Sequence, residues 1–158
     1  MKRMFIWLML FFLTIDLATK TWAEIALEIG ERQETTVPYL AWQLLYNEGM
    51  SFSLLEGYPI LVLILNFIAV SVVVFVLIKY IGQSFMWYIS GALIIAGGIG
   101  NFINRLFSGH VIDFISVKGY PAIFNVADIE IRFGVMFVLI LILKGYITEK
   151  RKQKVEEL

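Results

Sequence analysis

The feature that most constrains the fold is a stretch of 21 residues, 58–78, that contains no charged side chain. As a helix rising about 1.5 Å per residue, it can cross the hydrocarbon core of a bilayer, which is about 30 Å thick. Three other apolar stretches of similar length occupy residues 4–23, 85–105 and 129–147. The 158-residue chain is 59% hydrophobic and only 16% charged, unlike an ordinary soluble domain. We therefore predict one mainly α-helical membrane domain, residues 1–158, with four transmembrane helices.

The first apolar stretch has two interpretations. Lys2 and Arg3, an apolar run and Ala23 also fit a cleaved secretory signal peptide. Cleavage would remove Asp16 and Lys20, which are costly in an apolar segment and so are not expected there without a purpose. We predict an uncleaved first transmembrane helix.

The basic residues predict the orientation in the membrane. In a four-helix arrangement one side collects Lys2, Arg3, Lys79, Lys144, Lys150, Arg151, Lys152 and Lys154. The long first loop, residues 24–57, has six glutamates and only Arg32 as a base. The positive-inside rule then places both termini in the cytoplasm and both larger loops, 24–57 and 106–128, outside.

The outer loops contain β-prone segments. Residues 37–46 are rich in aromatic and β-prone side chains, and residues 111–117 alternate before a turn at 118–121 and an apolar segment at 122–124. These patterns predict a small extracytoplasmic β element that includes a hairpin. The charged tail, 148–158, is expected to be frayed.

Several classes of function are disfavoured by composition. The chain has no cysteine and one histidine, His110, so neither a thiolate metal site nor any other metal or cofactor is expected. The net charge is zero, which gives no reason to expect a nucleic acid partner. No serine nucleophile motif accompanies His110, and the glycines at 97–100 lie inside a predicted span, so neither a catalytic triad nor a phosphate loop is expected.

Polar residues from separate parts of the chain converge at one depth. Asp16 lies roughly 18 Å into the core and Lys20 about 6 Å further out. Seven further polar residues are expected to lie in the same outer third of the membrane or in the loops above it: Asn47, Asn101, Asn104, Arg105, Asp113, Asn125 and Asp128. This shared depth predicts a site at the outer face.

Two groups of these residues are candidates for holding the site in place rather than for chemistry. Asp16 and Lys20 are spaced i, i+4 and are expected to pair, either to support the site or only to fix the helix. Asn101 shares a helix face with Asn104 and Arg105, which could hold a carboxylate or a carbonyl, or could simply cap the helix at the interface. Asn66 is expected to form an interhelical hydrogen bond. The small residues before Asn101 predict close helix packing.

Asp113 and Asp128 are the candidates for chemistry. The hairpin is expected to bring Asp113 back toward the start of the fourth helix, where Asp128 could alternatively act only as its N-cap. Two carboxylates in a low-dielectric site cannot both ionise easily, so one pKa rises and the other falls. One could then accept a proton from water while the other donates a proton to a peptide carbonyl, as in an aspartic peptidase.

The ordered motifs resemble those of the lipoprotein signal peptidase family, the bacterial type II signal peptidases. The segments that carry the resemblance are DLATK at 16–20, NEGMSFS at 47–53, GGIGNFINR at 97–105, VIDFI at 111–115 and FNVAD at 124–128. The sequence departs from the family at Asn104, where an aspartate is usual, and at 129–132, where IEIR replaces a small polar start.

The resemblance implies an aspartic endopeptidase of the bacterial cytoplasmic membrane with its active site at the outer face. It implies Asp113 and Asp128 as the catalytic pair. Residues implied to position substrate or support the site are Asp16, Lys20, Asn47, Gly49, Asn101, Asn104, Arg105 and Asn125. The implied substrates are prolipoproteins cut just before a diacylglyceryl-modified cysteine, the other partners are membrane lipids, and a monomer is expected.

Two alternatives differ in class. A small proton- or ion-conducting protein could use the same acids, but the inner halves of the spans offer it only Lys144. A catalytically altered paralogue could bind signal peptides or lipids without cleaving them, and the change at Asn104 keeps this alternative open.

Overall fold

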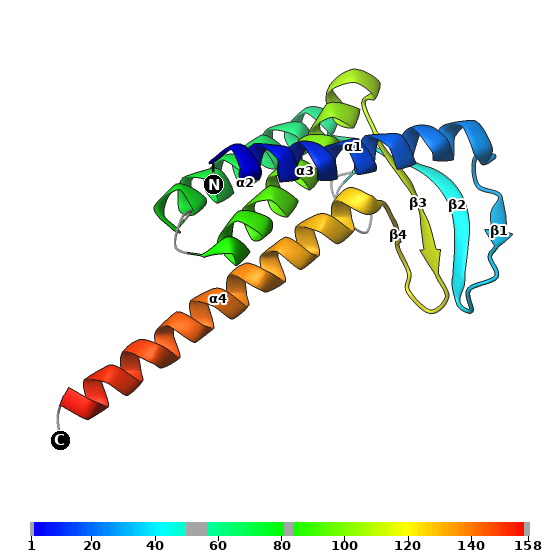
Figure 1. The fold of residues 1–158 in the computed structure, drawn as a ribbon. Helices are drawn as coiled ribbons and strands as arrows, with labels where there is room; N and C mark the ends of the chain where they lie inside the picture. Colours follow the sequence, from blue (N-terminus) through cyan, green and yellow to red (C-terminus); the bar gives the residue numbers. More distant parts are fainter. Residues whose placement is uncertain (1, 50–56, 81–83, 157–158) are drawn as a thin grey trace.

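The chain folds into four long helices with a small sheet at one end (Figure 1). The computed structural model describes residues 2–49, 57–80 and 84–156. The helices are α1 (Lys2–Ala26), α2 (Pro59–Tyr80), α3 (Phe85–Ser108) and α4 (Val126–Glu156), and the strands are β1 (Arg32–Glu34), β2 (Leu40–Asn47), β3 (Val111–Val117) and β4 (Ile123–Phe124). Each predicted apolar stretch therefore lies in a helix.

Two helix ends differ from expectation. α3 continues past Arg105 to Ser108 and ends at Gly109, whose φ of 78° favours glycine and whose N–H donates to the Arg105 carbonyl. The expectation of a frayed tail was wrong, because α4 continues to Glu156. The tail is rich in Glu, Lys, Arg and Gln, which are good helix formers, and contains neither glycine nor proline to stop the helix.

α3 is the central helix, and glycines let three neighbours approach it. A Cβ atom at Gly97 would collide with the backbone of Ala127 in α4, one at Gly98 with Val70 in α2, and one at Gly100 with the carboxylate of Asp16 in α1. These three glycines therefore define the close contacts of α3 with each of the other helices, as the small residues before Asn101 predicted.

The four strands form one antiparallel sheet in the order β1-β2-β3-β4. The predicted hairpin is confirmed, with Ile115 paired to Phe124 and Ser116 to Ile123. β2 pairs with β3 so that Leu45 lies opposite Asp113 and Asn47 opposite Val111. The end of β2 thus lies beside the part of β3 that carries Asp113.

The sheet packs on the C-terminal end of α1. Ala23 of α1 and Leu27, which directly follows α1, share a buried cluster with Leu44 of β2 and with Ile112, Phe114 and Ile115 of β3. The ring of Trp22 lies edge-on to Trp42 and Phe114, at centroid distances of 5.3 and 5.9 Å. Aromatic contacts of this kind fix α1 relative to the sheet.

Two helices within the described residues are long and apolar enough to cross a membrane, Arg3–Ala26 and Phe85–Ser108, and a shorter apolar segment is Ile60–Phe75. The prediction of four spans stays a prediction. In Figure 1 the N-terminus and the far end of α4 lie toward the end of the molecule opposite the sheet.

Candidate active site

Asp113 lies in the interior of β3. The strand is buried on both faces, so the side chain of Asp113 is only 1% exposed. Its two carboxylate oxygens accept hydrogen bonds from amide groups: Oδ2 from Asn47 Nδ2 at 2.8 Å and Oδ1 from Asn125 Nδ2 at 2.6 Å. A buried carboxyl group held by two donors has a fixed orientation.

Burial also changes the acidity of Asp113. Loss of solvent contact, reinforced by the negative charge of Asp128, raises the pKa of the Asp113 carboxyl from 3.8 to about 7. The hydrogen bonds from Asn47 and Asn125 act in the opposite direction but do not cancel the effect of burial. Asp113 therefore holds a proton up to neutral pH.

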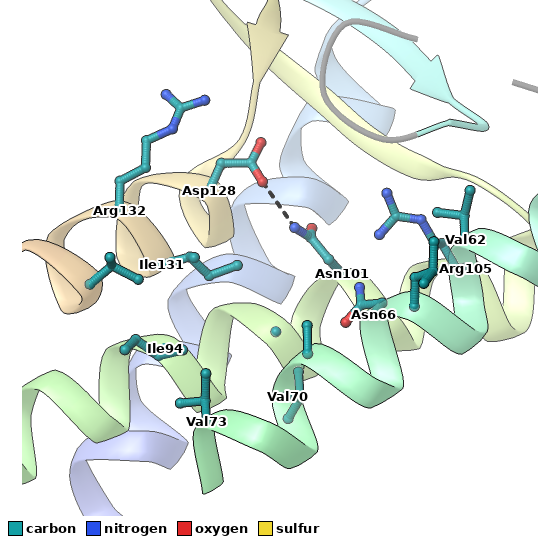
Figure 2. Close-up of a pocket in the computed structure, with 14 residues that line it drawn as sticks. Val62, Asn66, Val70, Val73, Ile94, Asn101, Arg105, Asp128, Ile131 and Arg132 are labelled. Atoms are coloured by element: carbon teal, nitrogen blue, oxygen red, sulfur yellow. Dashed lines mark hydrogen bonds between the residues drawn. The ribbon is translucent and has the colours of Figure 1, made fainter. Parts of the chain in front are cut away.

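Asp128 is the third residue of α4 and is not its N-cap. Asn125 occupies that position: its Oδ1 accepts the Asp128 N–H at 3.0 Å, while Asp128 Oδ2 accepts the Asn125 N–H at 3.3 Å. This reciprocal pair is a capping box. The N-cap expectation for Asp128 was wrong because Asn125, three residues earlier, supplies the capping oxygen. Asp128 Oδ1 remains turned toward α3, where Asn101 Nδ2 donates to it at 3.0 Å (Figure 2).

Asn125 joins the two carboxylates. Its side-chain amide donates to Asp113 and its backbone N–H donates to Asp128, so one residue holds both acids. The two aspartates also line the same small cavity, of about 50 Å³, which is large enough for water. The geometry brings together a protonated acid, a second carboxylate and space for a small nucleophile.

The predicted pairing of Asp16 with Lys20 is confirmed, and the pair is buried. Lys20 Nζ lies 2.8 Å from Asp16 Oδ2 and also donates to Asn101 Oδ1 at 2.8 Å. Asp16 Oδ1 accepts the N–H of Ala127 at 2.9 Å. The ion pair therefore links α1 to α3 and to the first turn of α4, and Asn101 carries the connection to Asp128.

Arg105 lies at the other side of the site. Its Nη2 donates to the Gly49 carbonyl at 2.9 Å, and the Gly49 N–H donates to Asn47 Oδ1 at 3.0 Å. Asn104 Oδ1 instead accepts the Ile112 N–H at 3.5 Å, and among the described residues its side chain forms no hydrogen bond with this network. Residues 50–53 of the motif at 47–53 lie outside the described residues.

A larger cavity, of about 480 Å³, lies between α2, α3 and α4 (Figure 2). Most of its lining is apolar, including Val70, Val73 and Ile94, and its polar end contains Asp128. The expected interhelical hydrogen bond of Asn66 is absent from the described part of the chain, and the side chain lines this cavity instead. This largely apolar cavity therefore extends to the carboxylate of Asp128.

Sequence reasoning missed two residues of α4. Arg132 lines both cavities, and its i+4 spacing from Asp128 was the signal that could have placed it there. Glu130 is 3% exposed, and within the described residues neither of its carboxylate oxygens has a hydrogen-bond partner. Nothing in the sequence marked this burial, because an acid in the outer turn of a membrane helix usually faces the interface.

No group of three His, Cys, Asp or Glu side chains able to hold a metal ion occurs in residues 2–49, 57–80 and 84–156.

Comparisons with known proteins agree on one family. The model of signal peptidase (SPase) II matches residues 8–144. The chain is 33% identical over 133 residues to the lipoprotein signal peptidase of Listeria welshimeri, covering 82% of this chain and 86% of that protein. It is 36% identical over 148 residues to the lipoprotein signal peptidase of Pseudomonas fluorescens, covering 89% of this chain and 87% of that protein.

Solved structures show the same likeness. A bacterial membrane enzyme determined by the in meso method at 2.3 Å resolution has a TM-score of 0.82 at 30% identity, over 90% of this chain and 89% of that one. A second such structure, at 1.9 Å resolution, has a TM-score of 0.79 at 30% identity, over 89% of this chain and 93% of that one.

Proposed function

This chain belongs to the signal peptidase II family, and from that premise we propose that it is an aspartic endopeptidase that removes signal peptides from prolipoproteins. The family and the names of the relatives support a peptidase that acts on signal peptides. The observation that carries the aspartic mechanism is that Asn125 holds both Asp113 and Asp128 at one small cavity.

In this mechanism the two aspartates have different roles. Asp128 accepts a proton from water as its oxygen attacks the scissile carbonyl carbon, and protonated Asp113 donates its proton to the carbonyl oxygen. As the tetrahedral intermediate collapses, Asp128 gives the proton it took from water to the leaving nitrogen, and the C–N bond breaks. Asp113 takes back its proton from the hydroxyl group as the carbonyl re-forms, so both acids return to their starting states. The raised pKa of Asp113 supports its role as the acid. The position of Asp128 in the first turn of α4 supports its role as the base, because a helix N-terminus stabilises negative charge.

The proposed substrate is a prolipoprotein with a diacylglyceryl-modified cysteine, cut just before that cysteine. The apolar cavity between α2, α3 and α4 supports a substrate that is apolar next to the scissile bond. Asn101, with the Asp16–Lys20 pair behind it, keeps Asp128 in place. Arg105 holds Gly49, and through it the residue Asn47 that positions Asp113.

We further propose a single-domain, monomeric, multi-pass protein of the bacterial cytoplasmic membrane, with four spans and both termini in the cytoplasm. Large apolar side chains are also exposed on α2 and α4, among them Phe67 and Phe75 on α2 and Leu139 and Leu143 on α4. An exposed apolar surface of this extent is suited to lipid. The site then lies at the outer face, where a lipid-modified cysteine is held.

The test is cleavage of a diacylglyceryl-modified prolipoprotein by the purified protein in detergent. We expect Asp113→Asn and Asp128→Asn each to lower kcat by at least about 100-fold, while substrate binding persists. Glu28→Gln is the matched control, because it removes an exposed acid at the sheet end of α1. Near-normal turnover by either aspartate variant would refute the dyad. Binding without cleavage by the unaltered protein would indicate a catalytically altered paralogue.

A further inference from the structure

We propose that Arg132 binds the carboxylate that cleavage creates at the end of the released signal peptide. The inference rests on the proposed function, because that carboxylate forms only if the peptide bond is cut at Asp113 and Asp128. It assigns to Arg132 a role in retaining the released signal peptide and in distinguishing its carboxylate end from an uncharged one.

The position of Arg132 supports this role. It follows Asp128 by four residues, so the two side chains lie on successive turns of the same face of α4 (Figure 2). Arg132 lines the small cavity that holds both aspartates and also the large apolar cavity. A peptide that lies in the large cavity and ends at the aspartates would have its new C-terminus beside this guanidinium.

The guanidinium is held in place but retains free donors. Its central carbon lies 5.2 Å from the centre of the Phe124 ring and 5.8 Å from that of Tyr120. Within the described residues, the only hydrogen bond of the Arg132 side chain goes to the Tyr120 hydroxyl, at 3.4 Å, and this side chain forms no ion pair there. An arginine has five N–H donors in a planar fork that matches a carboxylate, so most of them remain available.

The charge around the small cavity also favours an anion. Arg105 and Arg132 both line it, together with Asp113 and Asp128. When the two aspartates share one proton, the two guanidinium groups outnumber the single negative charge. Arg105 adds a specific donor, because its buried Nε has no hydrogen-bond partner among the described residues.

Hydrolysis supplies the matching anion. As the C–N bond breaks, the water oxygen stays on the carbonyl carbon and the leaving nitrogen takes up a proton. The remaining half of the substrate becomes a carboxylic acid, which ionises at neutral pH. This carboxylate forms at the small cavity that both aspartates line, and Arg132 lines the same cavity one helical turn beyond Asp128.

The experiment compares two forms of one synthetic apolar peptide of about ten residues, with either a free C-terminal carboxylate or a C-terminal carboxamide. Binding to the purified full-length protein in detergent is measured by calorimetry at neutral pH. We expect the carboxylate to bind about tenfold more tightly than the carboxamide, since a charged hydrogen bond distinguishes them. Arg132→Gln should remove this preference, and Arg132→Lys should keep part of it.

Arg32→Gln is the matched control, because Arg32 is an exposed arginine of β1 that lines neither cavity. It should retain the tenfold preference, and thermal unfolding should confirm that each variant is folded. A preference that survives in Arg132→Gln, or that is absent from the unaltered protein, would overturn the inference. Because binding needs no turnover, a preference that depends on Arg132 would stand even if the aspartate variants still cleaved.

Discussion

Asn125 forms hydrogen bonds through three different groups: its side-chain amide, its side-chain oxygen and its backbone N–H. Its side-chain amide donates to Asp113 and to Asn101, its side-chain oxygen caps α4, and its backbone N–H contacts Asp128. A single residue therefore caps α4 and forms hydrogen bonds with both acids.

Replacing Asn125 should affect both activity and stability. We expect Asn125→Ala to lower kcat by about 100-fold, because Asp113 loses a donor, and to cost about 1 kcal/mol or more of stability from the lost cap. Kinetics with the lipidated substrate and thermal unfolding measure the two effects. For the unfolding measurement, Asn66→Ala is the matched control, since the Asn66 side chain has no hydrogen bond in the described structure and its loss should cost little stability.

The raised pKa of Asp113 predicts a pH dependence of activity. The proton required for carbonyl protonation is lost as pH rises through about 7, so kcat should fall above neutrality. A pH profile of kcat tests this. Activity that is constant from pH 6 to 9 would contradict the role of Asp113 as the acid.

The free energy of unfolding should also depend on pH through the proton of Asp113. The folded state keeps the Asp113 proton up to about pH 7, whereas the unfolded chain loses it near 3.8, so the folded state binds more protons between these values. The contribution of Asp113 to stability is therefore complete below 3.8 and declines as pH rises to about 7. Asp113→Asn should flatten this decline, as measured by unfolding at a series of pH values.

Glu130 offers a test of an unsatisfied buried group. Its oxygens have no partner among the described residues, and burying such a group costs about 1–3 kcal/mol. Glu130→Met replaces it with an apolar side chain of similar length, so we expect the free energy of unfolding to rise by about 1 kcal/mol. A large loss of stability, measured as a lower Tm, would show instead that Glu130 makes a stabilising interaction.

At the scale of the elements, α3 depends on the absence of side chains at three positions. Gly100 is the critical one for activity, because a methyl group there would meet the carboxylate of Asp16 and displace the pair that supports Asn101. Gly98 faces the side chain of Val70, which is not part of that network.

We therefore expect Gly100→Ala to abolish most of the activity and to cost about 1–3 kcal/mol of stability. Gly98→Ala should cost a similar amount of stability with less effect on kcat. Combining Gly98→Ala with Val70→Ala should restore room and recover part of the stability. If Gly100→Ala were as active as the unaltered protein, Asp16 would not need its observed position.

The elements could be predicted because their signals are local. Membrane-length apolar stretches predicted the helices, and the alternation at 111–117 with its turn predicted the hairpin. The i, i+4 spacing likewise predicted the pairing of Asp16 with Lys20. The capping of α4 by Asn125 is equally local, since Asn125 and Asp128 are three residues apart, and this spacing was overlooked. The burial of Glu130 depends on packing, because it follows from how α4 meets its neighbours, and could not be predicted.

At the scale of the whole molecule, the orientation in the membrane can be tested because the chain has no cysteine. A single cysteine at Ile29, which is 63% exposed near the sheet, should react with a membrane-impermeant maleimide in intact spheroplasts. A cysteine at Val155, which is 73% exposed near the end of α4, should react only after permeabilisation. Equal labelling of both in intact spheroplasts would contradict the proposed topology.

The contact between Asp16 and the Ala127 N–H has a consequence for biosynthesis. Lys20 neutralises Asp16 within α1 itself, so α1 carries its own counter-ion into the bilayer. The final partner of Asp16, and Asp128 with it, is translated more than a hundred codons later. Nascent chains that stop before Val126 would insert as membrane-embedded intermediates and would be inert until the last helix emerges.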